Sequence, residues 1–287
     1  MQRTIGVIGG SGLYELEALE DRRELRISTP FGEPSDVLVT GVIGDVRYVF
    51  LPRHGRGHVL PPSRINYRAN VLALKLAGAE QLVSVSAVGS MKEHIHPGHM
   101  VIVDQFLDRT RHRVDTFFDE PGLVAHVGFS DPVDPALASA LHDAAVEAGA
   151  TVHPGGTYVC IEGPQFSSRA ESLGFRSMGV DVIGMTNMPE ARLAREAELP
   201  YATLAMATDF DCWHPGHEAV TVDQVLDVMR HNVEVAKRIL VALAARIPDP
   251  AASPSSTALA AALITPPAFV PPHVRERLAP LVAKYLP

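Results

Sequence analysis

The fold class of this chain is indicated by one stretch, Tyr201-Ala-Thr-Leu-Ala-Met-Ala-Thr-Asp209-Phe-Asp211-Cys-Trp213, which follows Pro200. Its first eight residues are mostly apolar, and a short run of this kind predicts a buried strand. Open α/β sheets bind ligands at the carboxyl ends of their strands, so Asp209 and Asp211 are expected at a ligand site. Alternation along the strand would point both carboxylates the same way, with Phe210 pointing oppositely.

Two carboxylates at one strand end suit a ligand with several N–H donors. A purine edge with an exocyclic amine and a protonated N7 is such a ligand. Two other interpretations stay open at this point: Asp209 caps a turn while Asp211 is solvated, or the pair contributes to a metal site.

Composition narrows the class of protein. The chain has 287 residues, 46% hydrophobic and 20% charged, with a formal net charge of −8. This length fits one large α/β domain or two smaller ones, and the acidic balance argues against nucleic acid as a partner. Cys160 and Cys212 are the only cysteines, which excludes a disulfide framework. With no signal-peptide pattern and no long apolar run, we expect a cytoplasmic protein that does not enter a membrane.

Three segments that follow short β-like runs carry anion-binding chemistry. The run Thr4–Ile8 leads into Gly9-Gly10-Ser11-Gly12, which offers backbone amides and a hydroxyl. A second run ends in Pro52-Arg53-His54, where the Arg supplies a planar fork and the His a second donor. A third, Gln81–Val85, leads into Ser86-Ala87. Each alone is equally well explained as a tight turn or a polar loop, but their recurrence favours one anion site.

Two further strand ends carry polar or aromatic side chains. Thr157–Ile161 leads into a segment with Phe166, which could stack on a flat ring, and Ser167, whose hydroxyl could reach the edge of that ring. Ser168 could instead cap the following helix. Val180–Ile183 leads into Gly184-Met185-Thr186, which brings one more hydroxyl.

The other polar clusters predict less. His94, His96 and His99 surround a Pro-Gly turn, which is poorly suited to hold a metal, so we expect a loop and no metal site. The segment Arg109–Arg113 is expected to be a solvated or mobile basic loop.

The alternation of strand and helix favours one α/β domain over residues 1–247, with a central mixed twisted sheet flanked by helices. Asp134-Pro135 predicts the start of a helix that ends at Gly149, and Thr221–Ala245 is the longest predicted helix. Residues 248–287 are expected to form a Pro- and Ala-rich arm with a terminal helix interrupted at Pro280.

Together these motifs resemble those of the 5′-methylthioadenosine phosphorylases, within the trimeric purine nucleoside phosphorylase group. The resemblance extends from the first strand to about Ile247 and leaves the tail beyond Pro248 uncovered. The matching runs are Ile8-Gly-Gly-Ser-Gly-Leu13, Thr29-Pro-Phe-Gly-Glu-Pro-Ser-Asp36, Arg53-His-Gly-Arg56, Asp104-Gln-Phe-Leu-Asp-Arg-Thr110, Ile161-Glu-Gly-Pro-Gln-Phe-Ser-Ser-Arg-Ala-Glu-Ser172 and Ala205-Met-Ala-Thr-Asp-Phe-Asp-Cys-Trp213.

The resemblance implies a purine nucleoside phosphorylase-like fold and a reversible phosphorolysis of methylthioadenosine. Inorganic phosphate is then a co-substrate, and no metal or organic cofactor is needed. By matched position, the residues implied to surround phosphate are Ser11, Arg53, His54, Ser86, Ala87 and Thr186. Ser11 and Ser86 stand where the family more often has Thr, and both keep the hydroxyl.

The same resemblance assigns the nucleoside site. The pair of Asp209 and Asp211 suits a 6-aminopurine, because a carboxylate accepts from the amine whereas an oxo group would need a donor. Because the leaving base gains negative charge, we hypothesise that Asp209, its pKa raised by burial, protonates or hydrogen-bonds N7 as the catalytic residue. The other implied contacts are Met185 at the ribose, Phe166 and Ser167 at the base, and Val222, Val225 and Leu226 at the methylthio tail. These last three can also be helix core, and one helix face can serve both purposes. A homotrimer is implied, with His126 of a neighbouring subunit closing the tail pocket.

Three other functions stay open from the sequence. A 6-oxopurine phosphorylase acting on methylthioinosine or inosine would share the fold and the phosphate site. A hydrolytic nucleosidase would need no phosphate, which leaves Arg53 and His54 unexplained. A non-catalytic nucleoside-binding module would need the same pocket without turnover.

Overall fold

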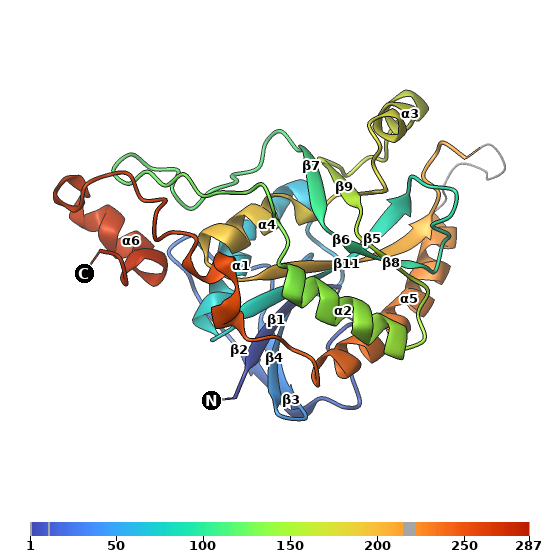
Figure 1. Ribbon diagram of the computed structural model, residues 1–287, viewed down its shortest axis with the longest axis horizontal. Coiled ribbons are helices and arrows are strands. Elements are labelled where there is room, and N and C mark those ends of the chain that lie inside the picture. The colour runs from blue at the N-terminus through green and yellow to red at the C-terminus, as the bar shows by residue number, and fades with distance from the viewer. Residues whose placement is uncertain (1, 11, 215–221, 287) are drawn as a thin grey trace.

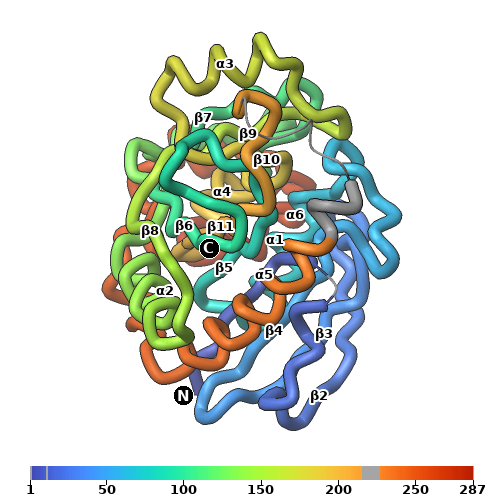
Figure 2. Tube along the Cα trace, turned by 90° about the vertical axis from the view of Figure 1, so that its right-hand side faces the viewer, coloured from blue at the N-terminus to red at the C-terminus, as the bar shows by residue number. Residues whose placement is uncertain are grey.

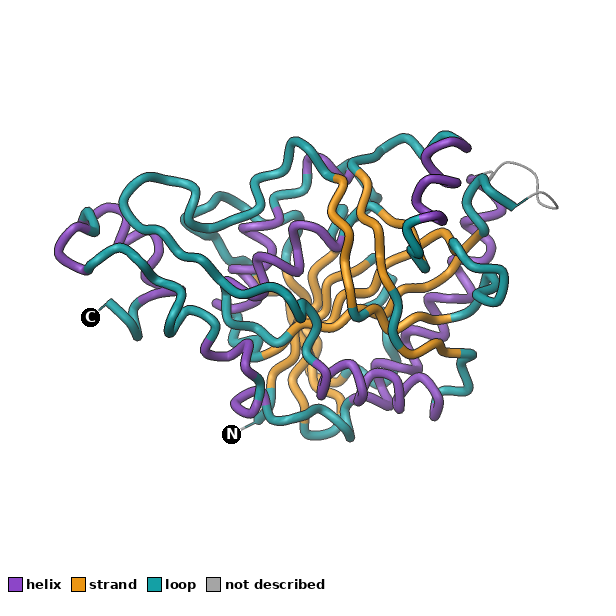
Figure 3. The backbone as a smooth tube through the Cα atoms, turned by 45° about the horizontal axis from the view of Figure 1, so that its top comes forward, coloured by secondary structure: helices purple, strands orange, loops and turns teal. Residues whose placement is uncertain are grey.

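The strands of this chain form one mixed sheet with helices on both faces, as Figures 1 and 3 show. The computed structural model describes residues 2–10, 12–214 and 222–286, and within residues 222–226 it describes no side chains. Eleven strands lie in the described residues. They are β1 (Thr4–Gly9), β2 (Glu20–Leu25), β3 (Leu38–Ile43), β4 (Val46–Pro52), β5 (Gln81–Ser90), β6 (Met100–Val103), β7 (Gln105–Arg109), β8 (Val152–Pro154), β9 (Thr157–Ile161), β10 (Val182–Gly184) and β11 (Tyr201–Asp209).

The helices are interspersed among these strands along the chain. The described α-helices are α1 (Tyr67–Leu76), α2 (Pro135–Glu147), α3 (Arg169–Ser177), α4 (Asn187–Glu196), α5 (Val222–Leu243) and α6 (Pro272–Val282). Short 3-10 turns cover Pro62–Arg64, Pro250–Ala252, Pro254–Thr257 and Pro267–Phe269. Asp134 caps α2 through a bond from the Leu137 amide, as its Asp-Pro start predicts.

Strand directions place several carboxyl ends together. β1 is parallel to β4 and to β5, and β5 is parallel to β11, so all four run the same way. β10 runs antiparallel to the last residues of β5, and β6 runs antiparallel to β11. The sheet is therefore mixed, which confirms the predicted fold class of one α/β domain with a central mixed sheet flanked by helices.

Two apolar cores lie on the two faces of the sheet. In β11, Ala202, Leu204 and Met206 pack into the core shared with α2 and α5, whereas Tyr201, Ala205 and Ala207 pack into the core shared with α1 and α4. Figure 2 shows α2 and α5 side by side on their face of the molecule. A strand covered on both faces must be apolar at successive positions, which explains why the run at 201–208 shows so little polar alternation.

The C-terminal arm returns to the body of the domain and then extends away from it with α6 (Figure 1). Its buried apolar side chains belong to the core on the α1 and α4 face, among them Leu259, Val274 and Leu278. The carboxylate of Glu198 ties the arm down: it accepts bonds from the Leu259 amide and the Tyr285 hydroxyl, at 2.9 Å and 2.6 Å, and it pairs with Lys284.

Two boundaries differ from those that the sequence predicts. The strand expected at 81–85 continues to Ser90, because its last residues pair with β10 and β11 after β1 has ended. The sequence Pro61-Pro62-Ser63 also predicts the cap of a helix that runs to about Ala77, but α1 starts at Tyr67, where the Asn66 side chain accepts from the Ala69 amide. Among the described helices, none combines the length and the apolar character that a membrane crossing requires.

Candidate active site

The carboxyl ends of four parallel strands meet at one edge of the sheet. β1 ends at Gly9, β4 at Pro52 and β11 at Asp209, and the Arg53 amide donates to the Gly9 carbonyl at 2.9 Å. The Arg53 segment therefore lies directly beside the glycine turn. Such an edge is where doubly covered α/β sheets bind their ligands.

A group of hydroxyls lies along β5 at this edge. The Ser86 hydroxyl is 3.1 Å from the Thr186 hydroxyl and 3.3 Å from the Tyr158 hydroxyl. β10 approaches β5 from the opposite direction, which is how Thr186, just after β10, reaches a residue in the middle of β5. Ala87 follows Ser86 on the same strand and is half-buried. The structure thus brings Ser86, Ala87 and Thr186 together as predicted, with Tyr158 as a member that the sequence did not reveal.

Arg53 is buried, with 2% of its surface exposed, and most of its donors are already used. Its guanidinium forms two bonds with the Glu190 carboxylate, at 2.8 Å and 3.1 Å. It also donates to the Ser84 hydroxyl at 2.7 Å and to the carbonyls of Ile8 and Val85 at 3.1 Å each. Two guanidinium nitrogens bind Glu190, and the remaining bonds tie the ends of β1 and β5 together, so the role of Arg53 at an anion stays a prediction.

His54 has one ring nitrogen committed to the protein. Its Nδ1 lies 2.8 Å from the Leu60 carbonyl, so Nδ1 carries the proton, and the ring stacks on His58 at 4.2 Å. Burial, together with the nearby Arg53 and His58, lowers the pKa of His54 to about 4. The ring is neutral near pH 7 and its Nε2 can only accept a hydrogen bond. The sequence suggested a donor here, whereas this ring state offers an acceptor at Nε2, and the place of His54 at the phosphate stays a prediction.

Asp209 and Asp211 lie over the same glycine, but for a reason other than strand alternation. A Cβ on Gly89 would lie 2.9 Å from Asp209 Oδ1 and 3.4 Å from the Asp211 Cβ. β11 ends at Asp209, and Asp211 sits in the next turn with a φ of 51°, where its amide donates to Asp209 Oδ1 at 2.7 Å. The turn, and not the pleat of a strand, brings the two carboxylates together.

Asp209 is suited to hold a proton. Its Oδ2 accepts from the Thr208 hydroxyl at 2.7 Å, and burial, aided by the neighbouring Asp211 charge, raises the pKa of Asp209. A carboxyl group whose pKa is raised in this way remains protonated closer to neutral pH and can act as a general acid.

Of the two residues predicted to bind the base, Ser167 has a buried hydroxyl and Phe166 has an exposed ring. The Ser167 hydroxyl oxygen is buried and has no hydrogen-bond partner among the described residues, while its carbonyl accepts from the Cys212 thiol at 3.4 Å. Ser167 therefore lies beside the Asp211 turn with a free polar atom. Phe166 is 57% exposed, so within one chain it does not form the wall of a closed pocket.

Met185 is held by residues that the sequence did not single out. Its carbonyl accepts from Arg113 at 2.7 Å, and its sulfur would lie 2.6 Å from a Cβ on Gly163, which has a φ of 65°. The side chain of Arg113 is only 2% exposed and also donates to the carbonyl of Glu162 at 2.8 Å. The end of the segment expected to be solvated or mobile is instead a buried clamp between the loops after β9 and β10.

Some predicted residues fall outside this cluster or outside the described residues. Ser11 and the side chains of Val222, Val225 and Leu226 are not among the groups that the structure describes. His126 is described, and its amide donates to the Ala262 carbonyl at 2.9 Å, so it lies against the C-terminal arm. Figure 1 shows that this arm lies at the opposite end of the molecule from the end of β11.

The histidines around the Pro-Gly turn pack against one another. His99 Nδ1 lies 3.0 Å from His153 Nε2, and the His96 ring lies edge-on to Phe210 with 5.6 Å between centroids. Across the residues that the structure describes, no group of three or more His, Cys, Asp or Glu side chains is arranged to hold a metal ion.

Comparison with known proteins gives consistent matches. The sequence profile of the Phosphorylase superfamily matches residues 4–245. An S-methyl-5′-thioadenosine phosphorylase of Geobacter sulfurreducens is 55% identical over 287 residues, covering 100% of both chains. One of Koribacter versatilis is 52% identical over 99% of this chain and 97% of its own. The likeness therefore includes the tail beyond Pro248, which the motifs alone did not cover.

Solved structures agree. A methylthioadenosine phosphorylase from an antarctic soil metagenomic library superposes with a TM-score of 0.92 at 48% identity, covering 98% of this chain and 99% of its own. A methylthioadenosine phosphorylase of Schistosoma mansoni, solved with adenine, superposes with a TM-score of 0.79 at 40% identity, covering 85% of this chain and 91% of its own. A variant of that protein, at 40% identity and a TM-score of 0.78 over the same 85% and 91%, was solved with methylthioadenosine.

Proposed function

The chain belongs to the phosphorylase superfamily, and from this premise we infer that it is a methylthioadenosine phosphorylase, a pentosyltransferase of the purine nucleoside phosphorylase type. It cleaves methylthioadenosine with inorganic phosphate to adenine and methylthioribose 1-phosphate, a reaction of purine and methionine salvage. The observation that carries this is the Asp209 and Asp211 pair at the edge of the sheet where the Arg53 segment, Ser86 and Thr186 also lie.

Phosphate is assigned to the hydroxyl side of this edge. Ser11, Ser86 and Thr186 offer hydroxyl groups, and Ala87 its backbone amide. The buried charge of Arg53 is compensated by Glu190, so Arg53 supplies a rigid frame with one remaining Nη1 hydrogen, and not a bidentate clamp. Neutral His54 accepts a hydrogen bond at Nε2, which suits the hydroxyl of a monoprotonated phosphate.

The base is assigned to the carboxylate side. Asp211 accepts from the 6-amino group, and the unpartnered Ser167 hydroxyl faces the same edge of the purine. As a phosphate oxygen attacks C1′ and the bond from C1′ to N9 breaks, the base gains electron density. Asp209 then transfers its proton to N7 and is reprotonated from solvent. Met185 lines the ribose, and Phe166 stacks on the base once a ligand or a neighbouring subunit covers it.

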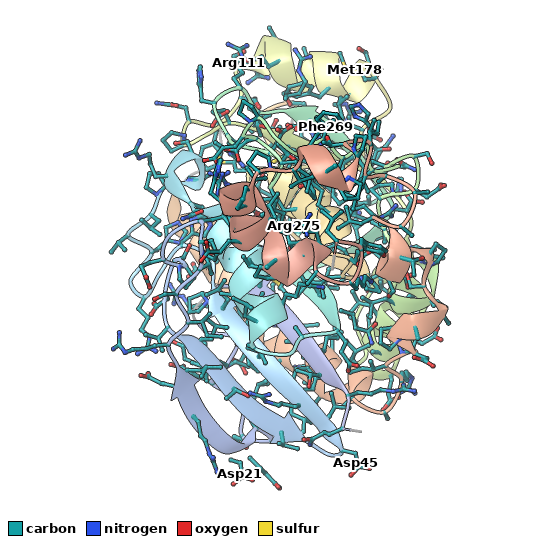
Figure 4. All side chains as sticks on the ribbon, turned by 90° about the vertical axis from the view of Figure 1, so that its left-hand side faces the viewer. Asp21, Asp45, Arg111, Met178, Phe269 and Arg275 are labelled. Atoms are coloured by element: carbon teal, nitrogen blue, oxygen red, sulfur yellow. The ribbon has the colours of Figure 1, made fainter. Side chains whose placement is uncertain are left out.

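The tail pocket and the assembly form the next part of the proposal. Val124, Ile264 and Phe269 are 46%, 58% and 75% exposed, and the Ile264 amide donates to the Val124 carbonyl, so large apolar side chains are exposed on the arm and on the loop beside it. Figure 4 shows Phe269 and Arg275 on this outer face. Apolar side chains gathered in this way mark an interaction surface. A homotrimer that buries it would carry His126 to a neighbour's tail pocket, which Val222, Val225 and Leu226 would line.

Nucleic acid is not a partner, and the protein acts in the cytoplasm without a metal or organic cofactor.

Base release from methylthioadenosine and from methylthioinosine, each with and without inorganic phosphate, tests the function. Adenine release that requires phosphate is the expected result. Hypoxanthine release alone would retain the phosphate site and replace the base assignment with that of a 6-oxopurine phosphorylase. Release without phosphate would make the protein a hydrolase, and binding without release would make it a nucleoside-binding module.

A further inference from the structure

The last turn of β11 contains an irregularity that sets where Asp209 lies. Ala207 pairs with Val88 and Asp209 with Gly89, so Thr208 is one residue more than the partner strand has. Such a bulge redirects the side chains that follow it. In a regular strand Asp209 would point to the same face as Ala207, which packs into the core shared with α1 and α4. The bulge instead places Asp209 over Gly89, beside Asp211.

Two donors hold the bulge from outside the β5 and β11 pair. The carbonyl of Ala207 accepts from the Gly98 amide at 2.8 Å and from Asn232 Nδ2 at 2.9 Å. Gly98 belongs to the loop before β6, whereas Asn232 lies on α5 and is 0% exposed. A single buried side chain thus fixes the distance between α5 and the residue at which β11 departs from regular pairing.

The chemistry of Asn232 argues against a role in packing alone. Its Oδ1 is buried and has no hydrogen-bond partner among the described residues. A buried acceptor without a donor costs free energy that an apolar side chain of the same shape would not. An amide is useful at this position because its other half donates to the Ala207 carbonyl.

The next residue of α5 touches the opposite side of the site. Val233 Cγ1 would lie 3.6 Å from a Cβ on Gly12, in the glycine turn after β1. Successive residues of one helix therefore contact the segment that carries the proton donor and the turn assigned to phosphate. A helix that spans both can hold the two halves of the reaction at a fixed separation.

We propose that Asn232 is a positioning residue for Asp209, holding the β11 bulge so that the carboxyl group reaches N7 of the leaving base. This rests on the proposed phosphorolysis. Asn232 itself touches neither phosphate nor base. Loss of the Asn232 amide leaves phosphate binding intact. It weakens proton transfer from Asp209 to the base, because Thr208 and Asp209 return toward regular strand pairing.

The test compares Asn232→Leu, of similar shape and without the amide, with Ile239→Val on the same helix. Ile239 is also 0% exposed, but it lies seven residues further along α5 and packs in the core shared with α2. Initial rates of adenine release are measured in the full-length chain while methylthioadenosine and phosphate are both varied. We expect Asn232→Leu to lower kcat by about 10- to 100-fold, as for a misplaced catalytic group, with the KM for phosphate changed by less than about 2-fold.

The pH profile separates positioning from loss of stability. In the wild type the alkaline limb of kcat reports the loss of the Asp209 proton. In Asn232→Leu that limb should move to lower pH, because a carboxyl group released from its buried position is better solvated. The Ile239→Val variant should keep both kcat and the position of the limb. If Asn232→Leu does not fold, Asn232→Ser, which is too short to reach Ala207, gives the same readouts.

Two results would overturn the proposal. In the first, both Asn232 variants match the control in kcat and in the position of the alkaline limb. In the second, the KM for phosphate rises while kcat stays unchanged. A wild-type enzyme that releases no adenine in the presence of phosphate would refute the proposed function instead, and that result is seen before any variant is made.

Discussion

Asp209 shows how a single side chain is prepared for proton transfer. One oxygen accepts from the Thr208 hydroxyl and the other from the Asp211 amide, so both are fixed while the group as a whole is half-buried. Burial raises the pKa of Asp209, whereas the two hydrogen bonds oppose that rise. The carboxyl group is thus oriented without being locked into its ionised form.

Replacement of Asp209 tests its role as general acid. Asp209→Ala should lower kcat for methylthioadenosine by roughly 10² or more, because the leaving adenine would depart without its proton. Asp209→Asn keeps the shape, and should lose a similar amount because an amide has no proton of suitable acidity to give. Steady-state adenine release measures both. Turnover near that of the wild type in either variant would exclude the role.

Glu190 offers a second test at the level of the residue. Its carboxylate is 1% exposed and faces the buried guanidinium of Arg53, so Glu190→Gln leaves a buried charge without its partner. We expect the free energy of unfolding to fall by roughly 3 to 5 kcal/mol. The matched control is Glu24→Gln, which removes a partner of Arg56 in an exposed pair and should cost about 1 kcal/mol or less. Urea unfolding measures both, and equal losses would show that Glu190 does not compensate Arg53.

The elements around the end of β11 hold one another through backbone bonds. The loop before β6 bonds to both backbone groups of Ala207. The Gly98 amide donates to the Ala207 carbonyl at 2.8 Å, and the Ala207 amide donates to the His99 carbonyl at 2.9 Å. The same loop carries His94, His96 and His99, which pack near His153 of β8. The charge state of His99 and His153 therefore acts on the segment that leads to Asp209.

Acid should weaken this loop. Burial and the neighbouring histidines lower the pKa values of His99 and His153 below the ordinary 6.5. The unfolded chain then binds more protons than the native one below that pH, so the free energy of unfolding falls as pH drops through about 6.5 and toward 5. His153→Gln should reduce this fall, whereas His273→Gln, at an exposed position of α6, should leave it unchanged. Urea unfolding at pH 7 and pH 5 measures the free energy of unfolding at each pH. An equal fall between the two pH values in the wild type and both variants would contradict this prediction.

At the scale of the whole molecule, the fold could be predicted further than the site. Continuous apolar runs and the Asp134-Pro135 cap marked β11 and α2, because such signals are local in the sequence. The partner of Arg53 could not be found, since Glu190 lies 137 residues away on another element. Nor could the bulge at Thr208, which depends on how β5 pairs with two neighbours at once.

The assembly is tested by its exposed face. If a homotrimer buries the arm, sedimentation equilibrium of the wild type should give a mass three times the 30.9 kDa of one chain. The double substitution Ile264→Asp and Phe269→Asp should give a folded monomer with much lower activity on methylthioadenosine, because the neighbour's His126 is lost. Leu173→Asp on α3, at another exposed apolar position, should change neither. A monomeric wild type with full activity would refute both the trimer and the role of His126.

The bonds of Glu198 to the arm also bear on how the protein is made. Glu198 directly precedes Leu199, Pro200 and β11, and its carboxylate is satisfied by Leu259, Lys284 and Tyr285, near the end of the chain. During synthesis β11 leaves the ribosome well before those last two residues do. A nascent chain still attached there, or a protein truncated after α5, therefore carries the Glu198 carboxylate beside its central strand without the three partners that hold it in the full-length fold.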